Sequence, residues 1–246
     1  AGIQRQWSER EPTDQPVIGR LVDRGLLDEL KGSAWAVVDG IDGRAHHLRF
    51  ASIDATTDCA LGGIVELAPP AHQGRGSQLI IRSDLPLERL IHAEGATWLD
   101  RQLVARQRPP RSAQGFGAEA NRALSAREEK LIERGLAIRS GSGFRPGADL
   151  LAKLRDQELA AIRSQIAARS GMRAIEACEG QSIAGTLRQR LTLASGRFAV
   201  LDDGLGFQLV PWSKPLDSQL GRDVVGTLLS GAKVEWNLGR AKGLDR

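Results

Sequence analysis

The sequence predicts an α+β protein in which two small β-barrel-like modules flank a helical, winged-helix-like middle. Short runs of β-branched and aromatic residues, separated by glycine turns, fill residues 17–70 and again residues 175–240. Between them, residues 85–174 carry apolar side chains at helical spacing. A glycine-rich turn at 140–143 within that middle is typical of a hairpin that follows helices.

The first β-module is preceded by a polar segment and followed by a loop. Residues 1–16 contain two prolines and many charges, which is typical of a tail or an incoming linker. In the module itself, residues 35–39 and 45–50 are expected to pair as a hairpin across a Gly-Ile-Asp-Gly turn. Residues 71–84 are interpreted as a loop.

The middle region is predicted to contain four helices and one hairpin. Two short helices are expected between residues 86 and 105, and a longer one over 117–136. A hairpin through the glycine-rich turn then leads to Asp149, which can cap a last helix over 150–170. The order helix, helix, helix, hairpin is that of a winged helix, and the last helix is a variation on it.

The second β-module ends at residue 240, and residues 241–246 are expected to be a tail. Residues 32–40 echo residues 194–204, because both read as a turn of small residues, then aromatic-Ala-Val-aliphatic-Asp, then a tight turn. Two interpretations stay open. Either any hairpin has this pattern, or the chain contains two related β-modules.

The composition limits the chemistry that this chain can perform. It contains no tyrosine, which excludes a tyrosine nucleophile or acid. Cys59 and Cys178 lie in no motif, and the adjacent His46 and His47 would point to opposite faces of a strand. There is no phosphate-binding loop and no nucleophile elbow. We therefore expect no enzyme, no metal site and no cofactor.

No signal peptide and no run of membrane-spanning length is recognisable in the sequence. A cytoplasmic protein with reduced thiols and no membrane partner is therefore expected.

Basic residues of the middle region are the candidate nucleic-acid contacts. The net charge is +4 and the pI about 9.5, which permits binding to nucleic acid. In a winged helix, the second helix and the hairpin, or wing, would carry the phosphate contacts. The candidates are Arg111, Arg122, Arg127, Lys130, Arg134, Arg139 and Arg145. The alternative is a solvated helix face, because glutamates alternate with these arginines.

Several blocks of sequence resemble one known family. They are residues 37–46, residues 86–90 with 96–101, residues 193–200, residues 207–212 and residues 219–222. Together, and in this order, they resemble the C-terminal domain of unknown function of plasmid and integrative-element relaxases, the mobilization nucleases of the agrobacterial virulence type. The resemblance implies a role in conjugative DNA transfer, next to a catalytic domain that nicks one strand with a tyrosine and a histidine-bound metal.

The chain departs from that family in two respects. It has no tyrosine and no His-hydrophobe-His motif, so the resemblance transfers no catalytic residue to it. The segment between the first β-module and the Leu-Glu-Arg-Leu helix is also shorter than is usual in the family, and any function of that insert is missing here.

Three hypotheses about function follow. The first is a non-catalytic accessory region of a relaxase that binds DNA near the transfer origin or docks to the transfer machinery. The second is a protein-interaction module that contacts a coupling or type IV secretion protein without touching DNA, with Trp212 or Trp236 as its anchor. The third is an independent enzyme without a recognised motif.

Overall fold

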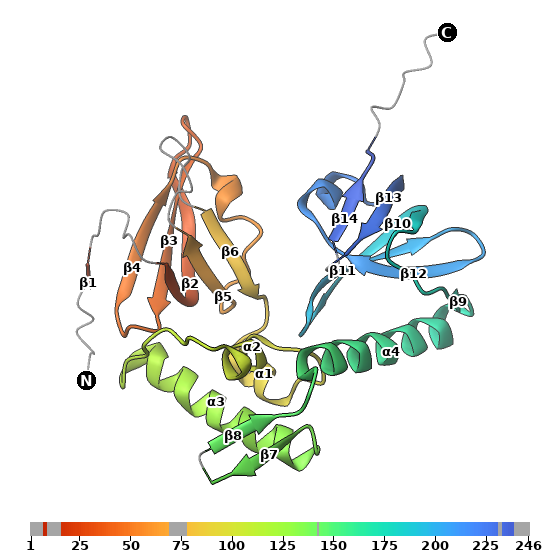
Figure 1. Ribbon diagram of the computed structural model, residues 1–246. Coiled ribbons are helices and arrows are strands. Elements are labelled where there is room, and N and C mark those ends of the chain that lie inside the picture. Colours follow the sequence, from red (N-terminus) through yellow and green to blue (C-terminus); the bar gives the residue numbers. More distant parts are fainter. Residues whose placement is uncertain (1–6, 9–15, 69–77, 142, 231–232, 239–246) are drawn as a thin grey trace. The chain divides into compact units, whose positions relative to one another are not determined.

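The computed structural model describes residues 7–8, 16–68, 78–141, 143–230 and 233–238. Within these residues the chain is a mixed α+β protein with three sheets and four α-helices (Figure 1). It divides into two compact units, Ala1–Lys153 and Leu154–Arg246. The predicted tails over 1–16 and 241–246 lie almost entirely outside the described residues.

The first unit begins with a six-stranded sheet. Its strands are β1 (Trp7–Ser8), β2 (Val17–Asp28), β3 (Ser33–Gly40), β4 (Ala45–Phe50), β5 (Ile64–Ala68) and β6 (Gln78–Ser83), in the order β1-β4-β3-β2-β5-β6. A short 3-10 helix, η1 (Ile53–Ala55), lies between β4 and β5. The predicted hairpin is β3–β4. The loop predicted over 71–84 is wrong in its second half, because β6 pairs antiparallel with β5 there.

Three helices and a two-stranded hairpin complete the first unit. They are α1 (Leu87–His92), α2 (Trp98–Val104), α3 (Gly115–Glu133), β7 (Ala137–Ser140) and β8 (Gly143–Pro146). Thr97 and Asp100 form a capping box that starts α2, because each side chain bonds the other residue's backbone N–H. Gly135, with a φ of +68°, ends α3 and lets the chain turn directly into β7.

The second unit is a helix packed on another six-stranded sheet. The elements are α4 (Leu150–Ser170), β9 (Arg173–Ala174), β10 (Ser182–Leu193), β11 (Gly196–Asp202), β12 (Gly206–Pro211), η2 (Lys214–Ser218), β13 (Asp223–Leu229) and β14 (Lys233–Trp236). The expected boundary at residue 174 is therefore misplaced. Leu159 and Ile162 of α4 pack against Phe198 of the sheet, so nearly all of this helix belongs to the second unit. Asp149 has a left-handed φ of 54°, unlike the extended backbone typical of an N-cap.

The two sheets have the same topology, which favours the interpretation of two related modules. The second sheet has the order β9-β12-β11-β10-β13-β14, which matches the first strand for strand. In each, a two-residue edge strand runs parallel to its neighbour, and the long first strand of the meander has twelve residues. Each also has a 3-10 helix before the strand that returns to pair with that long strand.

The correspondence extends to single residues. A bulge follows Leu21 in β2, and a bulge follows Leu187 in β10. Both leucines are fully buried, and each exchanges two backbone hydrogen bonds with the segment just before the returning strand. Gly19 and Gly185, two residues earlier, approach a facing aspartate backbone too closely for any Cβ. The two sheets thus share a bulge, a core leucine and a close glycine contact. The residue pattern common to all hairpins does not explain these three features together.

The barrel-like closure expected for each module is absent from the described residues. The edge strands of the first sheet are β1 and β6, and those of the second sheet are β9 and β14. Among the described residues, the two edge strands of each sheet are not hydrogen-bonded to each other. Each is an open sheet with a buried core that includes Leu21 and Val38 in the first sheet and Leu187 and Leu201 in the second.

The duplicated glycines Gly62 and Gly221 give the first prediction. Both have φ near +78° (79° and 77°) and donate their N–H to Leu21 and Leu187 respectively. Because a Cβ disfavours this conformation, we expect Gly62→Ala and Gly221→Ala each to destabilise its own unit by about 1–2 kcal/mol in urea unfolding. Gly141→Ala, at an uncrowded glycine without positive φ, is the matched control and is expected to be neutral. Equal effects at all three positions would contradict the prediction.

Candidate nucleic-acid interface

Helix α3 and the β7–β8 hairpin form one structural block. The buried side of α3 carries Phe116, Ala120 and Leu124, whereas Asn121, Arg122, Ser125, Ala126, Glu129 and Glu133 are exposed. Backbone hydrogen bonds join Leu136 to Leu131 at the end of α3, and Gly147 to Leu136 across the base of the hairpin (both 2.9 Å). The hairpin is thereby held next to the C-terminal end of α3.

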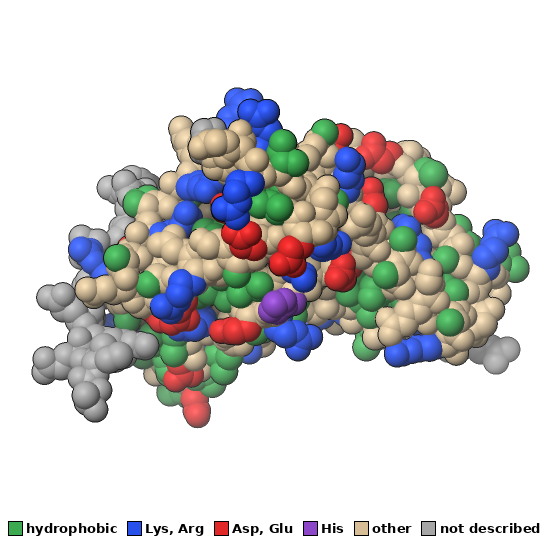
Figure 2. Space-filling view, turned by 90° about the horizontal axis from the view of Figure 1, so that it is seen from below, with side chains coloured by type: hydrophobic (Ala, Val, Ile, Leu, Met, Phe, Trp, Pro, Cys, Tyr) green, Lys and Arg blue, Asp and Glu red, His purple; other side chains and the backbone are tan. Residues whose placement is uncertain are grey.

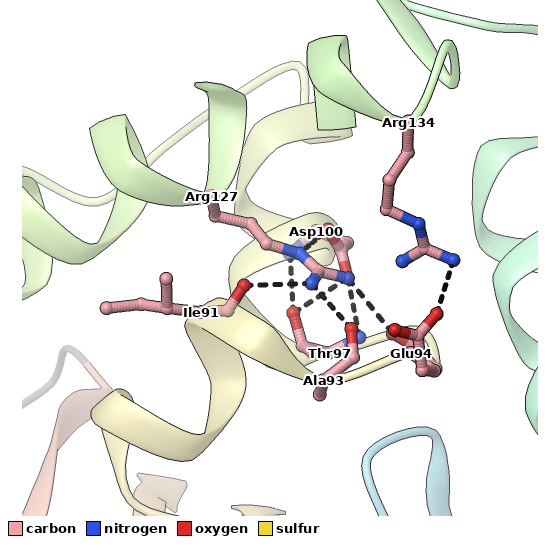
Figure 3. Close-up of polar contacts among 8 residues, drawn as sticks. Ile91, Ala93, Glu94, Thr97, Asp100, Arg127 and Arg134 are labelled. Carbon is pink, nitrogen blue, oxygen red and sulfur yellow. Dashed lines mark hydrogen bonds and ion pairs between the residues drawn. The ribbon is translucent and has the colours of Figure 1, made fainter. Parts of the chain in front are cut away.

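Arg127 lies in the core, so the contact with nucleic acid predicted for it is wrong. Its guanidinium is fully buried and forms a two-point ion pair with Asp100, at 2.8 Å from Nε to Oδ1 and 2.9 Å from Nη2 to Oδ2 (Figure 3). It also donates to the carbonyl oxygens of Ile91, Ala93 and Gly95. Arg127 thus fastens the α1–α2 turn to α3 and cannot reach a phosphate.

Three further candidates are held in ion pairs. Arg134 bonds Glu94 at 2.8 Å, and Lys130 bonds Glu133 at 3.0 Å. Arg139 of β7 pairs with Glu129 of α3, and this hydrogen bond raises the pKa of the guanidinium. These pairs neutralise the C-terminal half of the exposed α3 face and leave little net charge there.

Arg111 stands beside the N-terminal half of α3. Its Nε donates to the Oδ1 of Asn121 at 2.7 Å. Burial, together with the nearby positive charge of Arg108, lowers the pKa of the Arg111 guanidinium. Arg108 and Arg111 therefore place two positive charges near this end of the helix.

Arg122 and Arg145 are the two candidates that remain exposed and unpaired with any described residue. Arg122 lies next to Asn121, one turn before Ser125, on the open face of α3. Arg145 of β8 is directly opposite Ile138 of β7, and Ile138 is 60% exposed. The outward side of the hairpin therefore presents one cation and one apolar side chain, while Arg139 on the other side holds the hairpin to α3.

The structure adds two residues that the sequence reasoning did not select, Asn121 and Ser125. Both lie on the exposed stripe of α3, at i−1 and i+3 from Arg122. The sequence signal for these two residues is their polar character at helix positions that alternate with the regular apolar stripe of α3. Figure 2 shows basic and acidic side chains interspersed over one face of the molecule, so charge alone does not single out this region.

Trp212 and Trp236 both contribute to the core of the second sheet. Each packs against the buried cluster around Leu187 and Val224, and each is half-buried. The guanidinium of Arg190 lies 5.4 Å from the Trp212 ring, and the indole N–H of Trp212 donates to Asp217 at 3.2 Å. Packing and pairing account for Trp212, which weakens it as an interface anchor, whereas the buried indole N–H of Trp236 has no hydrogen-bond partner among the described residues.

Potential catalytic groups are dispersed among the described residues. No cluster of three or more His, Cys, Asp or Glu side chains that could hold a metal ion occurs within that part of the chain. His46 is buried and bonds the Asp42 carboxylate at 3.1 Å across the β3–β4 turn. Cys59 is buried and Cys178 exposed. None of the helices that the structure describes is long and apolar enough to cross a membrane.

Comparison with known proteins identifies one family. The family model described as a protein of unknown function (DUF3363) matches residues 3–81 and 71–245, which is nearly the whole chain. No curated protein and no solved structure matches the sequence significantly.

Proposed function

We propose that this chain, which belongs to the DUF3363 family of proteins of unknown function, is a non-catalytic accessory region of a conjugative relaxase. In this role the chain binds duplex DNA near the transfer origin. The relaxase context comes from the sequence blocks described above. The complete lack of tyrosine argues against strand cleavage by this chain.

The observation that carries the DNA-binding part is a surface defined by cations of α3 and of the β7–β8 hairpin. Arg111 and Arg122 lie at the N-terminal half of α3, and Arg145 lies on the outer side of the hairpin next to the other end of the helix. The carboxylates Glu119, Glu129 and Glu133 of α3 are engaged by Arg20, Arg139 and Lys130. The order of α1, α2, α3 and the hairpin is that of a winged helix. In helix-turn-helix proteins the N-terminal residues of the recognition helix contact the major groove, which is the half of α3 that carries Asn121 and Arg122 here.

A double substitution tests this proposal. Arg122→Ala/Arg145→Ala removes two exposed cations without disturbing any ion pair between described residues. We expect the slope of log affinity against log salt for a fluorescent duplex to fall by about 2, with roughly tenfold weaker binding at low salt. Fluorescence anisotropy over a salt series measures both quantities.

The matched control is Lys153→Ala/Arg169→Ala, which removes the same charge from two exposed positions of α4. If both pairs weaken binding equally, the attraction is a property of net charge and not of this surface. Absence of binding at low salt by the unmodified chain would contradict the DNA-binding proposal altogether.

A protein-docking function is the second candidate, with a coupling or type IV secretion protein as the expected partner. The observation that favours it is a group of exposed apolar side chains on β2 and the turn after it, Val22, Leu26, Leu27 and Leu30. Exposed patches of this kind mark interaction sites more often than single scattered leucines do.

A further inference from the structure

The second sheet shows what covers the outer face of this module. Phe198, Val200, Phe207 and Leu209 of β11 and β12 are buried there beneath α4. The helix contributes Leu159, Ile162 and Ile166, an apolar set at i, i+3 and i+7. An amphipathic helix is therefore the natural covering of this face in this chain.

The strand registers identify the same positions in the first sheet. When the two bulges are superimposed, Leu21 is equivalent to Leu187. Their partners on the neighbouring strands, Val38 and Leu201, are then equivalent as well. Trp35 and Val37 then stand where Phe198 and Val200 stand, and His47, opposite Val37, stands where Leu209 stands. All three are half-buried, whereas their counterparts in the second sheet are almost inaccessible.

This face of the first sheet is partly aromatic. A Cβ on Gly25 would lie 3.0 Å from the Trp35 indole, so the ring rests on the glycine backbone. The ring also stacks on His47, with centroids 5.7 Å apart and planes at 12°. Helix α3 contacts the far end of the same face, where Arg20 bonds Glu119 and lies over Phe116. Trp35, at the other end of the face, is half-buried in the part of the chain that the structure describes.

The strand and turn beside Trp35 add exposed leucines. Leu26 and Leu27 are both about half exposed, and Leu30 at the tip of the turn is 99% exposed. The carboxylates of Asp23, Asp28 and Glu29 offset the positive charges of Arg24, Lys31 and Arg49 around Trp35, so this surface has no positive excess that would attract a phosphate backbone. This surface therefore suits an apolar partner better than a nucleic acid.

We propose that the surface formed by Leu27, Trp35, Val37 and His47, which we name the Trp35 face, docks an amphipathic helix of a partner protein. The partner's helix presents apolar side chains at i, i+3 and i+7 and crosses β2–β4 as α4 crosses β10–β12. A second copy of this chain is a poorer occupant, because its own amphipathic helix α4 is already packed on its own second sheet. This site is separate from the DNA-binding surface proposed above.

A peptide with the sequence of residues 150–170 serves as the probe, because α4 fits the equivalent face in the same chain. The tethered α4 keeps the second sheet occupied through its high effective concentration, so a free peptide reports on the Trp35 face. We expect saturable, micromolar binding of the fluorescein-labelled peptide to the full chain in an anisotropy titration. Trp35→Ala is expected to weaken binding at least tenfold.

Two variants guard against misfolding and non-specific effects. Leu27→Glu changes an exposed side chain, so the fold is retained, and it is also expected to weaken binding tenfold. Ile138→Ala changes an exposed apolar residue on the β7–β8 hairpin and is expected to leave binding unchanged. Circular dichroism verifies the fold of each variant, and Arg122→Ala/Arg145→Ala should bind the peptide normally even if it loses DNA.

Four outcomes would overturn the proposal. The first is no saturable binding up to roughly 1 mM peptide, which corresponds to a negligible affinity. The second is binding that depends on Phe198 and not on Trp35. The third is that a single-stranded oligonucleotide displaces the peptide and binds the Trp35→Ala variant more weakly than the unmodified chain. The Trp35 face would then be a platform on which bases stack. The fourth is a dimer in sedimentation that Leu27→Glu dissociates, which would make the occupant a second copy.

Discussion

Arg127→Met is expected to lower the free energy of unfolding of the first unit by about 3–5 kcal/mol, the typical cost of breaking a buried ion pair by removing one partner. The substitution leaves the Asp100 carboxylate buried without its two-point partner. It also leaves the carbonyls of Ile91, Ala93 and Gly95 without their donor. Urea unfolding followed by circular dichroism measures the loss.

Arg122→Met is the matched control for this prediction. It makes the same chemical change one to two turns earlier in α3, at an exposed position, and is expected to stay within about 0.5 kcal/mol of the unmodified protein. Arg127→Lys is expected to be destabilising too, because an ammonium group cannot reproduce the planar set of donors that Arg127 uses. A loss below about 1 kcal/mol for Arg127→Met would contradict the structural role assigned to this residue.

The contrast between Arg122 and Arg127 shows what the sequence could not reveal about the site. Both arginines lie on the same helix and both were predicted to contact DNA. Position 127 falls by spacing within the buried helical stripe of Phe116, Ala120, Leu124 and Leu131, but the charge of an arginine favours the exposed side. Only the tertiary position of Asp100, twenty-seven residues away, explains how a charged residue can occupy it.

The fold was more predictable than the site, because most of its elements are defined by local patterns. The helices of the middle region and the glycine-tipped hairpin follow from spacing and turn residues. The assignment of α4 to the second unit did not follow, since its apolar residues fit either neighbour and only packing on Phe198 and Phe207 decides. Strand β6 was missed because its short apolar run resembles a loop until β5 is placed beside it.

The module duplication was visible in the sequence only as an echo of one hairpin. Sequence similarity is weak because the equivalent positions hold different residues, such as Trp35 for Phe198 and His46 for Gln208. What the two modules share is backbone geometry, above all the bulge after Leu21 and Leu187. A bulge is specified by pairing between strands and so leaves no periodic signal in a single sequence.

Glu158 connects α4 to the second sheet and carries the other large expected effect. Its buried carboxylate accepts the backbone N–H groups of Ala194 and Ser195, both at 2.9 Å, in the β10–β11 turn. Glu158→Ala would leave both donors buried without this acceptor, at about 1–3 kcal/mol each, so we expect a total loss of roughly 2–6 kcal/mol. The loss should appear in the unfolding of the second unit, which contains both partners.

Asp156→Ala is the control for this effect, because Asp156 is an exposed carboxylate on the same helix whose ion pair with the adjacent Arg155 spans 3.5 Å. We expect it to change the free energy of unfolding by less than about 0.5 kcal/mol. Glu158→Gln keeps one acceptor oxygen and should lie between the two. If Glu158→Ala were as mild as Asp156→Ala, α4 would be held on its sheet by Leu159, Ile162 and Ile166 alone. An apolar helix with matching spacing would then suffice to cover the Trp35 face as well.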